Sequence, residues 1–347
     1  MAYTSIDDPT ILFNTVLYTG NGGTQSVTGV GFQPDWIWIK NRSNAENHAL
    51  IDSVRGVGKQ LISNATGAEY NNANSVTAFG SDGFSVGNLS DVNNSSNNIV
   101  AWNWKAGTSF SNDASATSVG TIDSTGSINT DAGFSIISYT GTGSAGTVAH
   151  GLGVAPKWYF TKNRDTADNW LVYHEDIGNT KGAFLNVTNT PGTSSAYWNN
   201  TSPTSTVFSV GTEVPMNKSG DDIIAYCFAE KQGYSKFGKY TGNANTNGPF
   251  VYTGFRPAWI MVKATDASKS WYIWDSKRAG GSNLVDDILL ADTADTEFDG
   301  SNIDILSNGF KLRGSGSGEN GSGTNYIYMA FAEQPFVNSN GVPCNAR

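Results

Sequence analysis

A group of acidic residues near the C-terminal end matches the first half of a calcium-binding loop. Asp295, Glu297 and Asp299 fall at positions 1, 3 and 5 of such a loop, and Gly300 falls at position 6. Carboxylate oxygens at this spacing are ligands that Ca²⁺ takes, but position 12 is Leu306, where a bidentate Glu would be required. We therefore expect an acidic, solvated turn and no cofactor, with a calcium site at these three residues as the alternative.

Aromatic residues crowd two short segments that could bind a sugar. Trp170 and Tyr173 fall in one segment, and Trp271, Tyr272 and Trp274 fall in the other. Successive side chains of a strand point to opposite faces, so the second set is hard to bury together. Sugars stack on exposed aromatic faces, and Asn- and Asp-rich loops nearby could bond their hydroxyls. We expect these residues to lie in a core or a subunit interface, with a glycan site as the alternative.

Motifs for phosphate binding or nucleophilic catalysis lack the context that they need. Residues 141–146 match G-x-G-x-x-G after a predicted strand, but Thr147 to Gly151 do not begin a helix that could receive a pyrophosphate. We expect a plain turn there. The three histidines, His48, His150 and His174, have neither metal-ligand spacing nor a Ser/His/Asp frame beside them.

Three carboxylates fall on related segments but do not form an obvious catalytic pair. A glycosidase needs two carboxylates that face each other across a cleft. Asp52, Glu175 and Asp275 occupy similar places in segments far apart in the chain. Shared ancestry of these segments explains the similarity better than a joint active site. We therefore expect no enzymatic activity, and we keep glycan hydrolysis as the last of three hypotheses.

These residues belong to a chain in which one sequence frame occurs three times. A Gly opens the frame, Pro follows three residues later, Trp two residues after Pro, and Lys four residues after Trp. The copies cover residues 31–42, 153–164 and 254–263, and their tryptophans are Trp36, Trp158 and Trp259. A fixed frame that recurs in this way indicates an internal repeat.

The frame predicts a turn followed by a buried strand. Gly tolerates the dihedral angles of a turn, and Pro has no amide to donate to a ladder, so it should stand before the strand or at its first residue. Alternation places Trp36 and Trp38 on one face of the first copy, and Ile37 and Ile39 on the other. We expect a central strand that is covered on both faces, with the frame tryptophans in the core of each repeat.

Matched strands before and after the frame complete the repeat. Each copy begins with a strand that ends in Tyr-Thr-Gly and closes on an aromatic-rich strand. Six or seven short strands in about 100 residues predict an antiparallel β-sandwich. The predicted fold is all-β, with three tandem, homologous β-sandwich repeats and little helix. The predicted parts are an N-terminal arm at 1–16, repeats at 17–107, 135–234 and 235–336, a Ser/Thr/Gly-rich linker at 108–134, and a C-terminal tail at 337–347.

Composition excludes several classes of partner. The net charge is −9 and no run of Lys or Arg offers a footprint for phosphates, so we expect no nucleic-acid partner. Two cysteines cannot form a disulfide framework for three repeats. No apolar run approaches the roughly 20 residues of a membrane span, and the first residues lack the pattern of a signal peptide. We expect synthesis in a cytoplasm and no membrane span.

The same segments resemble a family of repeat-bearing structural and tail-fibre-like virion proteins of tailed bacteriophages, especially marine ones. The third copy departs from the family pattern, because Ala264-Thr265 replaces Asn-Arg after the frame lysine. The resemblance covers nearly the whole chain and rests on the frame at 31–42 and on the segments at 6–9, 52–56, 81–84, 100–107 and 330–336.

The resemblance implies a non-enzymatic virion protein that is made in the host cytoplasm. Its place on the particle would be a tail fibre, an adaptor or a head decoration, and its partners would be other virion proteins. The arm and the tail would reach other subunits, and we expect a homo-oligomer, with a trimer favoured by analogy. The first alternative is a lectin-like protein that binds host surface glycans, and several weak sites on one oligomer would then act by avidity.

Overall fold

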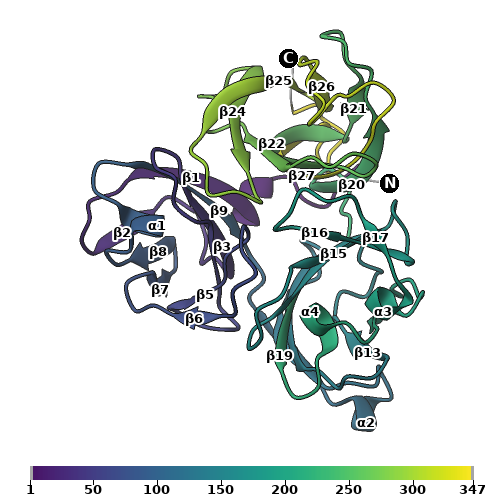
Figure 1. The fold of residues 1–347 in the computed structure, drawn as a ribbon. Coiled ribbons are helices and arrows are strands. Elements are labelled where there is room, and N and C mark those ends of the chain that lie inside the picture. The colour runs from purple at the N-terminus through teal and green to yellow at the C-terminus, as the bar shows by residue number, and fades with distance from the viewer. Residues whose placement is uncertain (1–2, 345–347) are drawn as a thin grey trace.

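The computed structural model describes residues 3–344, apart from the side chain of Ser301, and its architecture is all-β. Helix among these residues is confined to four α-helices of four residues each and one 3-10 turn. None of the helices in this part of the chain has the length and apolar character needed to cross a membrane. Figure 1 shows three lobes arranged around a common centre.

The first lobe (residues 9–104) contains a four-stranded sheet and two smaller sheets. Its four-stranded sheet has the order β1-β9-β3-β4, a three-stranded sheet has the order β2-β8-β7, and β5 pairs with β6. The elements are η1 (Pro9–Ile11), β1 (Phe13–Thr19), β2 (Gln25–Thr28), β3 (Trp36–Asn41), β4 (Ala49–Asp52), β5 (Lys59–Gln60), β6 (Tyr70–Asn71), β7 (Val76–Gly80), β8 (Gly83–Val86), α1 (Ser90–Asn93) and β9 (Asn98–Trp104).

The second lobe (residues 108–228) is built on an eight-stranded sheet. The order of this sheet is β10-β11-β12-β19-β14-β15-β16-β17, and β13 pairs separately with β18. The elements are β10 (Thr108–Asn112), α2 (Ala114–Thr117), β11 (Ser124–Asn129), β12 (Phe134–Thr140), β13 (Gly146–Ala149), β14 (Trp158–Asn163), β15 (Leu171–His174), β16 (Lys181–Phe184), β17 (Gly192–Thr193), α3 (Ser195–Trp198), β18 (Val207–Val210), α4 (Val214–Asn217) and β19 (Asp222–Phe228).

The third lobe (residues 235–335) has one continuous sheet of eight strands. The strand order is β20-β27-β22-β23-β24-β25-β26-β21, so β21 lies at one end. The elements are β20 (Ser235–Thr241), β21 (Phe250–Tyr252), β22 (Phe255–Ala264), β23 (Trp271–Asp275), β24 (Leu284–Leu290), β25 (Phe298–Leu306), β26 (Gly309–Leu312) and β27 (Asn325–Pro335).

One order of four strands appears in all three lobes. The strand that leads into Tyr-Thr-Gly (β1, β12 or β20) pairs with the last strand of its lobe, the last strand pairs with the frame strand, and the frame strand pairs with the strand that follows it. These ladders are antiparallel. The four-strand series are β1-β9-β3-β4, β12-β19-β14-β15 and β20-β27-β22-β23.

Each frame strand is buried on both faces, as the alternation predicted. In β3, Ile37 and Ile39 belong to the core inside the first lobe, whereas Trp36 and Trp38 point to a separate central core. Each of the other lobes also has its own core. The central core takes residues from all three lobes, so one face of every frame strand is covered by other lobes.

The turn that precedes each frame strand also follows the prediction at its glycine. Gly31, Gly153 and Gly254 have φ values of 86°, 72° and 84°, a region that L side chains rarely adopt. The prolines differ among the copies. Pro34 and Pro156 stand before their strands, but Pro257 lies inside β22 at a register shift. The prediction that Pro precedes the strand is thus wrong for the third copy, where a bulge accommodates the missing amide.

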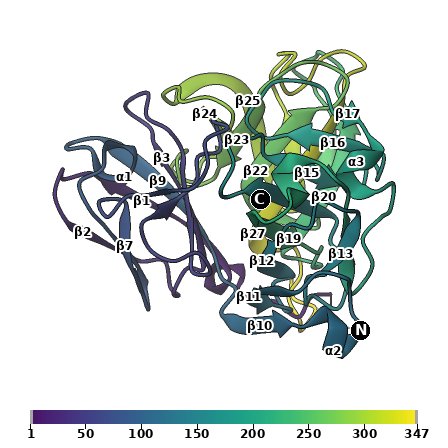
Figure 2. The same ribbon diagram turned by 60° about the horizontal axis from the view of Figure 1, so that its bottom comes forward.

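The segment predicted as a linker at 108–134 is largely ordered sheet. Strands β10 and β11 pair with each other, and β11 pairs with β12, so the segment extends the sheet of the second lobe (Figure 2). Phe110 and Ile128 pack against the core of that lobe, which explains why the segment is fixed. The linker prediction is wrong because this segment forms antiparallel ladders with the sheet and packs two apolar side chains against its core.

The predicted arm and tail contact their own chain. Strand β1 begins at Phe13, before the predicted boundary at residue 17. The hydroxyl of Thr4 donates to the carbonyl oxygen of Gln232 at 2.7 Å, and the amide of Ser339 donates to Asp7 at 2.6 Å. The arm thus lies against the connection that leads into the third lobe, and the tail contacts the arm. Residues 1–2 of the arm and 345–347 of the tail fall outside the described residues.

Candidate functional site

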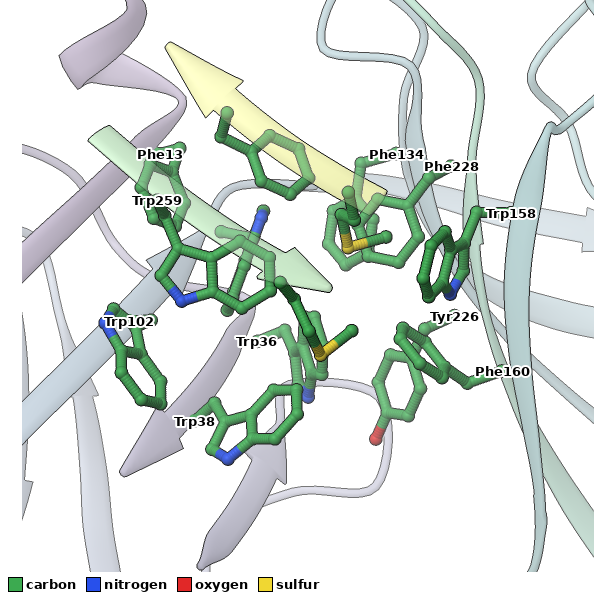
Figure 3. Packing of buried hydrophobic residues seen from close by; sticks show 14 of the residues in the cluster. Phe13, Trp36, Trp38, Trp102, Phe134, Trp158, Phe160, Tyr226, Phe228 and Trp259 are labelled. Atoms are coloured by element: carbon green, nitrogen blue, oxygen red, sulfur yellow. The ribbon is translucent and has the colours of Figure 1, made fainter. Parts of the chain in front are cut away.

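The three lobes meet in a central core of large aromatic side chains (Figure 3). Ring centroids of the first and second lobes approach to 4.6 Å between Trp36 and Tyr226. The first and third lobes meet at 5.7 Å between Trp104 and Trp259. The second and third lobes meet at 5.8 Å between Phe228 and Phe331. Each lobe therefore contacts both of the others through aromatic rings.

The tryptophans Trp36, Trp158 and Trp259 all lie in this central core, with exposed fractions of 1%, 0% and 0%. The sequence placed them in the cores of separate repeats, and the structure instead places them in one core that the lobes share. Aromatic pairs contribute about 0.5–1.5 kcal/mol each beyond the burial of their area. The centre is thus a contact that resists separation of the lobes.

Around this core, a buried lysine from each lobe reaches a neighbouring lobe. Lys40, Lys162 and Lys263 are the lysines of the three sequence frames, and each is 0% exposed. Their ammonium groups donate across to backbone carbonyls, Lys40 to Ala294 at 3.0 Å, Lys162 to Thr66 at 2.9 Å and Lys263 to Thr188 at 3.0 Å. The bonds run in one direction around the centre, from the first lobe to the third, the third to the second and the second to the first.

Burial controls the protonation of these lysines. Desolvation lowers the pKa of each ammonium group from 10.5 to about 8, and nearby carboxylates oppose the shift. Lys40 donates to three carbonyl oxygens in all, those of Asn41, Glu46 and Ala294. The positive charge is therefore held by backbone dipoles without a direct ion pair.

A second set of hydrogen bonds also joins neighbouring lobes. Its side chains lie at the start of the strand that follows each frame strand, namely β4, β15 and β23. The indole N–H of Trp170 donates to the carbonyl of Ile62 at 2.8 Å, and that of Trp271 donates to the carbonyl of Phe184 at 2.9 Å. In the first lobe the corresponding residue is His48, whose Nε2 lies 2.9 Å from the carbonyl oxygen of Leu290. His48 Nδ1 accepts from the Trp38 indole, so Nε2 must carry the proton and donate.

Two of the three seams between lobes are closed by an arginine–glutamate–arginine group. At the first–third seam, Glu297 accepts from Arg42 at 2.8 Å and from Arg278 at 2.7 Å. Arg278 is fully buried and also pairs with Asp275 at 2.6 Å. Since Arg42 belongs to the first lobe and the other residues to the third, the group links two lobes by charge.

The first–second seam repeats this arrangement. Glu69 accepts from Arg164 at 3.1 Å and from Arg55 at 3.1 Å, and Arg55 also pairs with Asp52. Burial raises the pKa of Glu69, but the bonds and charges of the two arginines outweigh this effect and hold its pKa below the usual value. Glu69 is therefore ionised throughout the neutral range.

Among residues 3–344, the second–third seam lacks this group. Thr265 occupies the position of Arg42 and Arg164 in the other two copies. His174 pairs with the frame tryptophan of its lobe, whereas a buried aspartate, Asp52 or Asp275, has this position in the other two lobes. Lys239 and Asp176 form an ion pair at 3.0 Å in its place. A cavity of about 360 Å³ lies beside this pair and is lined in part by Ile177, Thr265 and Asp266. This seam is the least tightly closed of the three.

Four of the five aromatic residues considered for glycan binding are buried. Trp170, Trp271 and Trp274 are 0% exposed, and Tyr173 is 2% exposed. Tyr272 is partly buried and stacks on Trp274 at 5.7 Å. Sugar stacking on these rings is therefore wrong as an interpretation, because neighbouring residues cover their faces. Trp170 and Trp271 do lie at interfaces, but these interfaces join lobes of one chain.

The calcium hypothesis for Asp295, Glu297 and Asp299 is also wrong. The carboxylate of Glu297 is engaged by two arginines, and Asp299 lies inside β25, where the loop would have to continue. Within residues 3–344, no group of three or more His, Cys, Asp and Glu side chains is placed to hold a metal ion. The alternating acids that suggested a calcium loop have two separate origins. Glu297 is part of the seam between lobes, and Asp299 belongs to strand β25.

The remaining catalytic candidates serve structural roles. Residues 141–146 lead into β13 rather than a helix, as expected for a plain turn. Asp52 and Asp275 are 0% exposed and paired with arginines, so a substrate cannot reach them. Desolvation lowers the pKa of the three buried histidines, to about 4 for His150 and His174, so they are neutral at pH 7.

Sequence reasoning missed the charged residues of the seams. Arg42, Arg164, Arg55, Arg278 and Glu69 were not among the predicted site residues. One signal was present, because Asp-x-x-Arg follows the frame at Asp52–Arg55 and again at Asp275–Arg278. Glu69 and Glu297 carry no comparable signal. Each lies in a loop directly before a strand, and no fixed spacing connects it to the frame.

Comparison with known proteins gives a family but no activity. No curated protein matches the chain. A family model described as "Domain of unknown function (DUF7483)" matches residues 8–335. The match includes all three lobes and every seam residue described above. The chain therefore belongs to the DUF7483 domain family.

Proposed function

We propose that the chain is a non-enzymatic structural protein of a tailed-bacteriophage virion, which serves as a tail-fibre, adaptor or head-decoration component and contributes to host attachment. Other virion proteins would be its partners. The single observation that carries this proposal is the closed central junction, where three frame strands, three buried lysines and two arginine–glutamate–arginine groups hold the lobes together. Such an interior favours rigidity, which a particle component needs.

The same proposal treats the lobes as three tandem, homologous β-sandwich repeats. The shared order of four strands and the matched frame support this interpretation. The cyclic direction of the lysine bonds supports descent from a unit that once assembled as a trimer. Oligomerisation of the present chain stays a prediction, and we expect a homotrimer by analogy, which light scattering on the purified protein would measure.

The virion role is tested on purified particles of a phage that encodes the chain. Mass spectrometry of these particles should detect the protein at a stoichiometry that matches ordered density in a cryo-electron microscopy map. The map should fit three lobes around one centre. Absence of the protein from particles that remain infectious would contradict the proposal.

Glycan binding is kept as a second function, because one specific surface feature favours it. The aromatic residues first considered for this role are buried, but two others are exposed on β21. Hydrolysis of a glycan is not favoured by any feature of the described residues. Asp52 and Asp275 are buried and paired with arginines, and the exposed Glu175 pairs with Lys157.

A further inference from the structure

Strand β21 lies at the periphery of the third lobe (Figure 1), and two of its three residues are exposed aromatics. Phe250 and Tyr252 are 45% and 54% exposed, whereas Val251 between them is 6% exposed. β21 is the last strand of its sheet and pairs with β26. Exposed apolar residues on an edge strand favour unwanted association, so their presence calls for a function.

The matched strands of the other two lobes have no aromatic residue at these places. A valine faces a phenylalanine across each small ladder, and these pairs are Val27 with Phe84, Val148 with Phe208 and Val251 with Phe310. The residues that flank the valine are Ser26 and Thr28 in the first lobe and Thr147 and Ala149 in the second. The shared fold therefore does not require Phe250 and Tyr252.

A polar cavity of about 220 Å³ adjoins Tyr252. The residues that line it include Tyr3, Glu230, Gln232 and Lys236. Lys236 pairs with Glu230 at 2.7 Å, and the Tyr3 hydroxyl lies 3.3 Å from that of Tyr252. The cavity beside Tyr252 is thus lined by residues that carry an ammonium group, a carboxylate, an amide and a hydroxyl.

This combination matches the two needs of a sugar ring. The C–H face of a hexose packs on an aromatic ring, and its hydroxyls need donors and acceptors arranged around the edge. The cavity holds one cation paired with one anion, so it favours a neutral ligand over a phosphate or a polyanion. A protein strand added to β21 would use the backbone edge and would not require the polar cavity.

We propose that Tyr252 and Phe250, with the adjoining cavity, bind a neutral hexose unit of a bacterial surface polysaccharide. This inference rests on the proposed role in host attachment and names the ligand class for that role. The two exposed aromatic residues occur on the third lobe alone, so a monomer has one such site. An oligomer would present several copies and gain affinity by avidity.

The test compares the wild-type chain with a double variant, Phe250→Ser and Tyr252→Thr, which takes the flanking residues of the first lobe. Because those residues already serve the matched strand β2, the variant should fold, which urea unfolding will check. Both proteins are applied to an array of O-antigen and capsular oligosaccharides, and the strongest neutral ligand is titrated by calorimetry. Val57→Ser, which removes a 47% exposed valine in the first lobe, is the matched control.

We expect binding of at least one hexose-containing oligosaccharide, a loss of affinity of at least about tenfold in the double variant, and no change in Val57→Ser. Lys236→Met should weaken the same ligand severalfold while the rings remain. A wild-type array without binding would overturn the inference, and so would equal binding by the double variant. Loss of self-association in the double variant, seen by light scattering without any glycan binding, would assign the rings to a protein contact and also overturn it.

Failure here is distinguishable from failure of the virion role. If the protein is present in particles but binds no glycan, the site is wrong and the structural role stands. If it binds glycan through Tyr252 but is absent from particles, the site stands and the virion role is wrong.

Discussion

Replacing Glu297 by glutamine tests whether charge holds the first–third seam. The change keeps the shape of the side chain but removes the anion between Arg42, whose side chain is 16% exposed, and Arg278, whose side chain is 0% exposed. Removing one partner of a buried ion pair typically destabilises a protein by 3–5 kcal/mol. Arg278 keeps its bond to Asp275 and Arg42 keeps some solvent, so we expect a loss of about 2–4 kcal/mol in the free energy of unfolding.

The measurement is urea unfolding at pH 7 followed by tryptophan fluorescence, which reports mainly on the central core because eight of the ten tryptophans lie there. Glu69→Gln should produce a loss of similar size, because it makes the same pair of bonds at the first–second seam. Glu175→Gln is the control, since this carboxylate is 58% exposed and an exposed ion pair contributes about 1 kcal/mol or less. A loss at Glu297 no larger than that at Glu175 would refute the reasoning.

Three further predictions concern pH and the open seam. Lys40, Lys162 and Lys263 have a pKa of about 8 when folded and 10.5 as the reference value, so the folded chain binds fewer protons between these values and stability should rise with pH from about 8 to 10.5. Lys263→Met should reduce that slope in urea unfolding, and an unchanged slope would contradict the assignment. His174 has a pKa of about 4 when folded, so the unfolded chain takes up its proton first and stability should fall as pH drops from 6.5 toward 4, a fall that His174→Gln should lessen. Hydrogen exchange should be faster for residues bordering the cavity at the second–third seam, such as Ile177 and Thr265, than for Arg42 and Arg164; equal protection would count against a weaker seam.

The alternation within single strands could be predicted from the sequence because it is a local property. The order Trp36, Ile37, Trp38, Ile39 indicates two buried faces whatever covers them. What covers the tryptophan face depends on residues far along the chain, since Trp36 contacts Tyr226 and Trp104 contacts Trp259. The frame therefore indicated a buried strand in each repeat but not one core common to all lobes.

The errors at the candidate site have the same physical origin. Glu297 looked like a calcium ligand because its partner Arg42 lies 255 positions away in the chain. Trp271, Tyr272 and Trp274 looked hard to bury together, yet the Trp271 indole finds a carbonyl acceptor in a neighbouring lobe. Long-range partners of this kind leave no periodicity or spacing in the sequence. The edge aromatics Phe250 and Tyr252 were overlooked because only the comparison of matched strands sets them apart.

Scanning calorimetry of the intact chain tests the shared central core most directly. If the lobes are joined by one core, the chain should unfold in a single transition whose van't Hoff and calorimetric enthalpies agree. Trp36→Ala should lower the midpoint of that whole transition. Two or three separate transitions, with only one of them moved by Trp36→Ala, would show that the lobes unfold independently and would contradict the account.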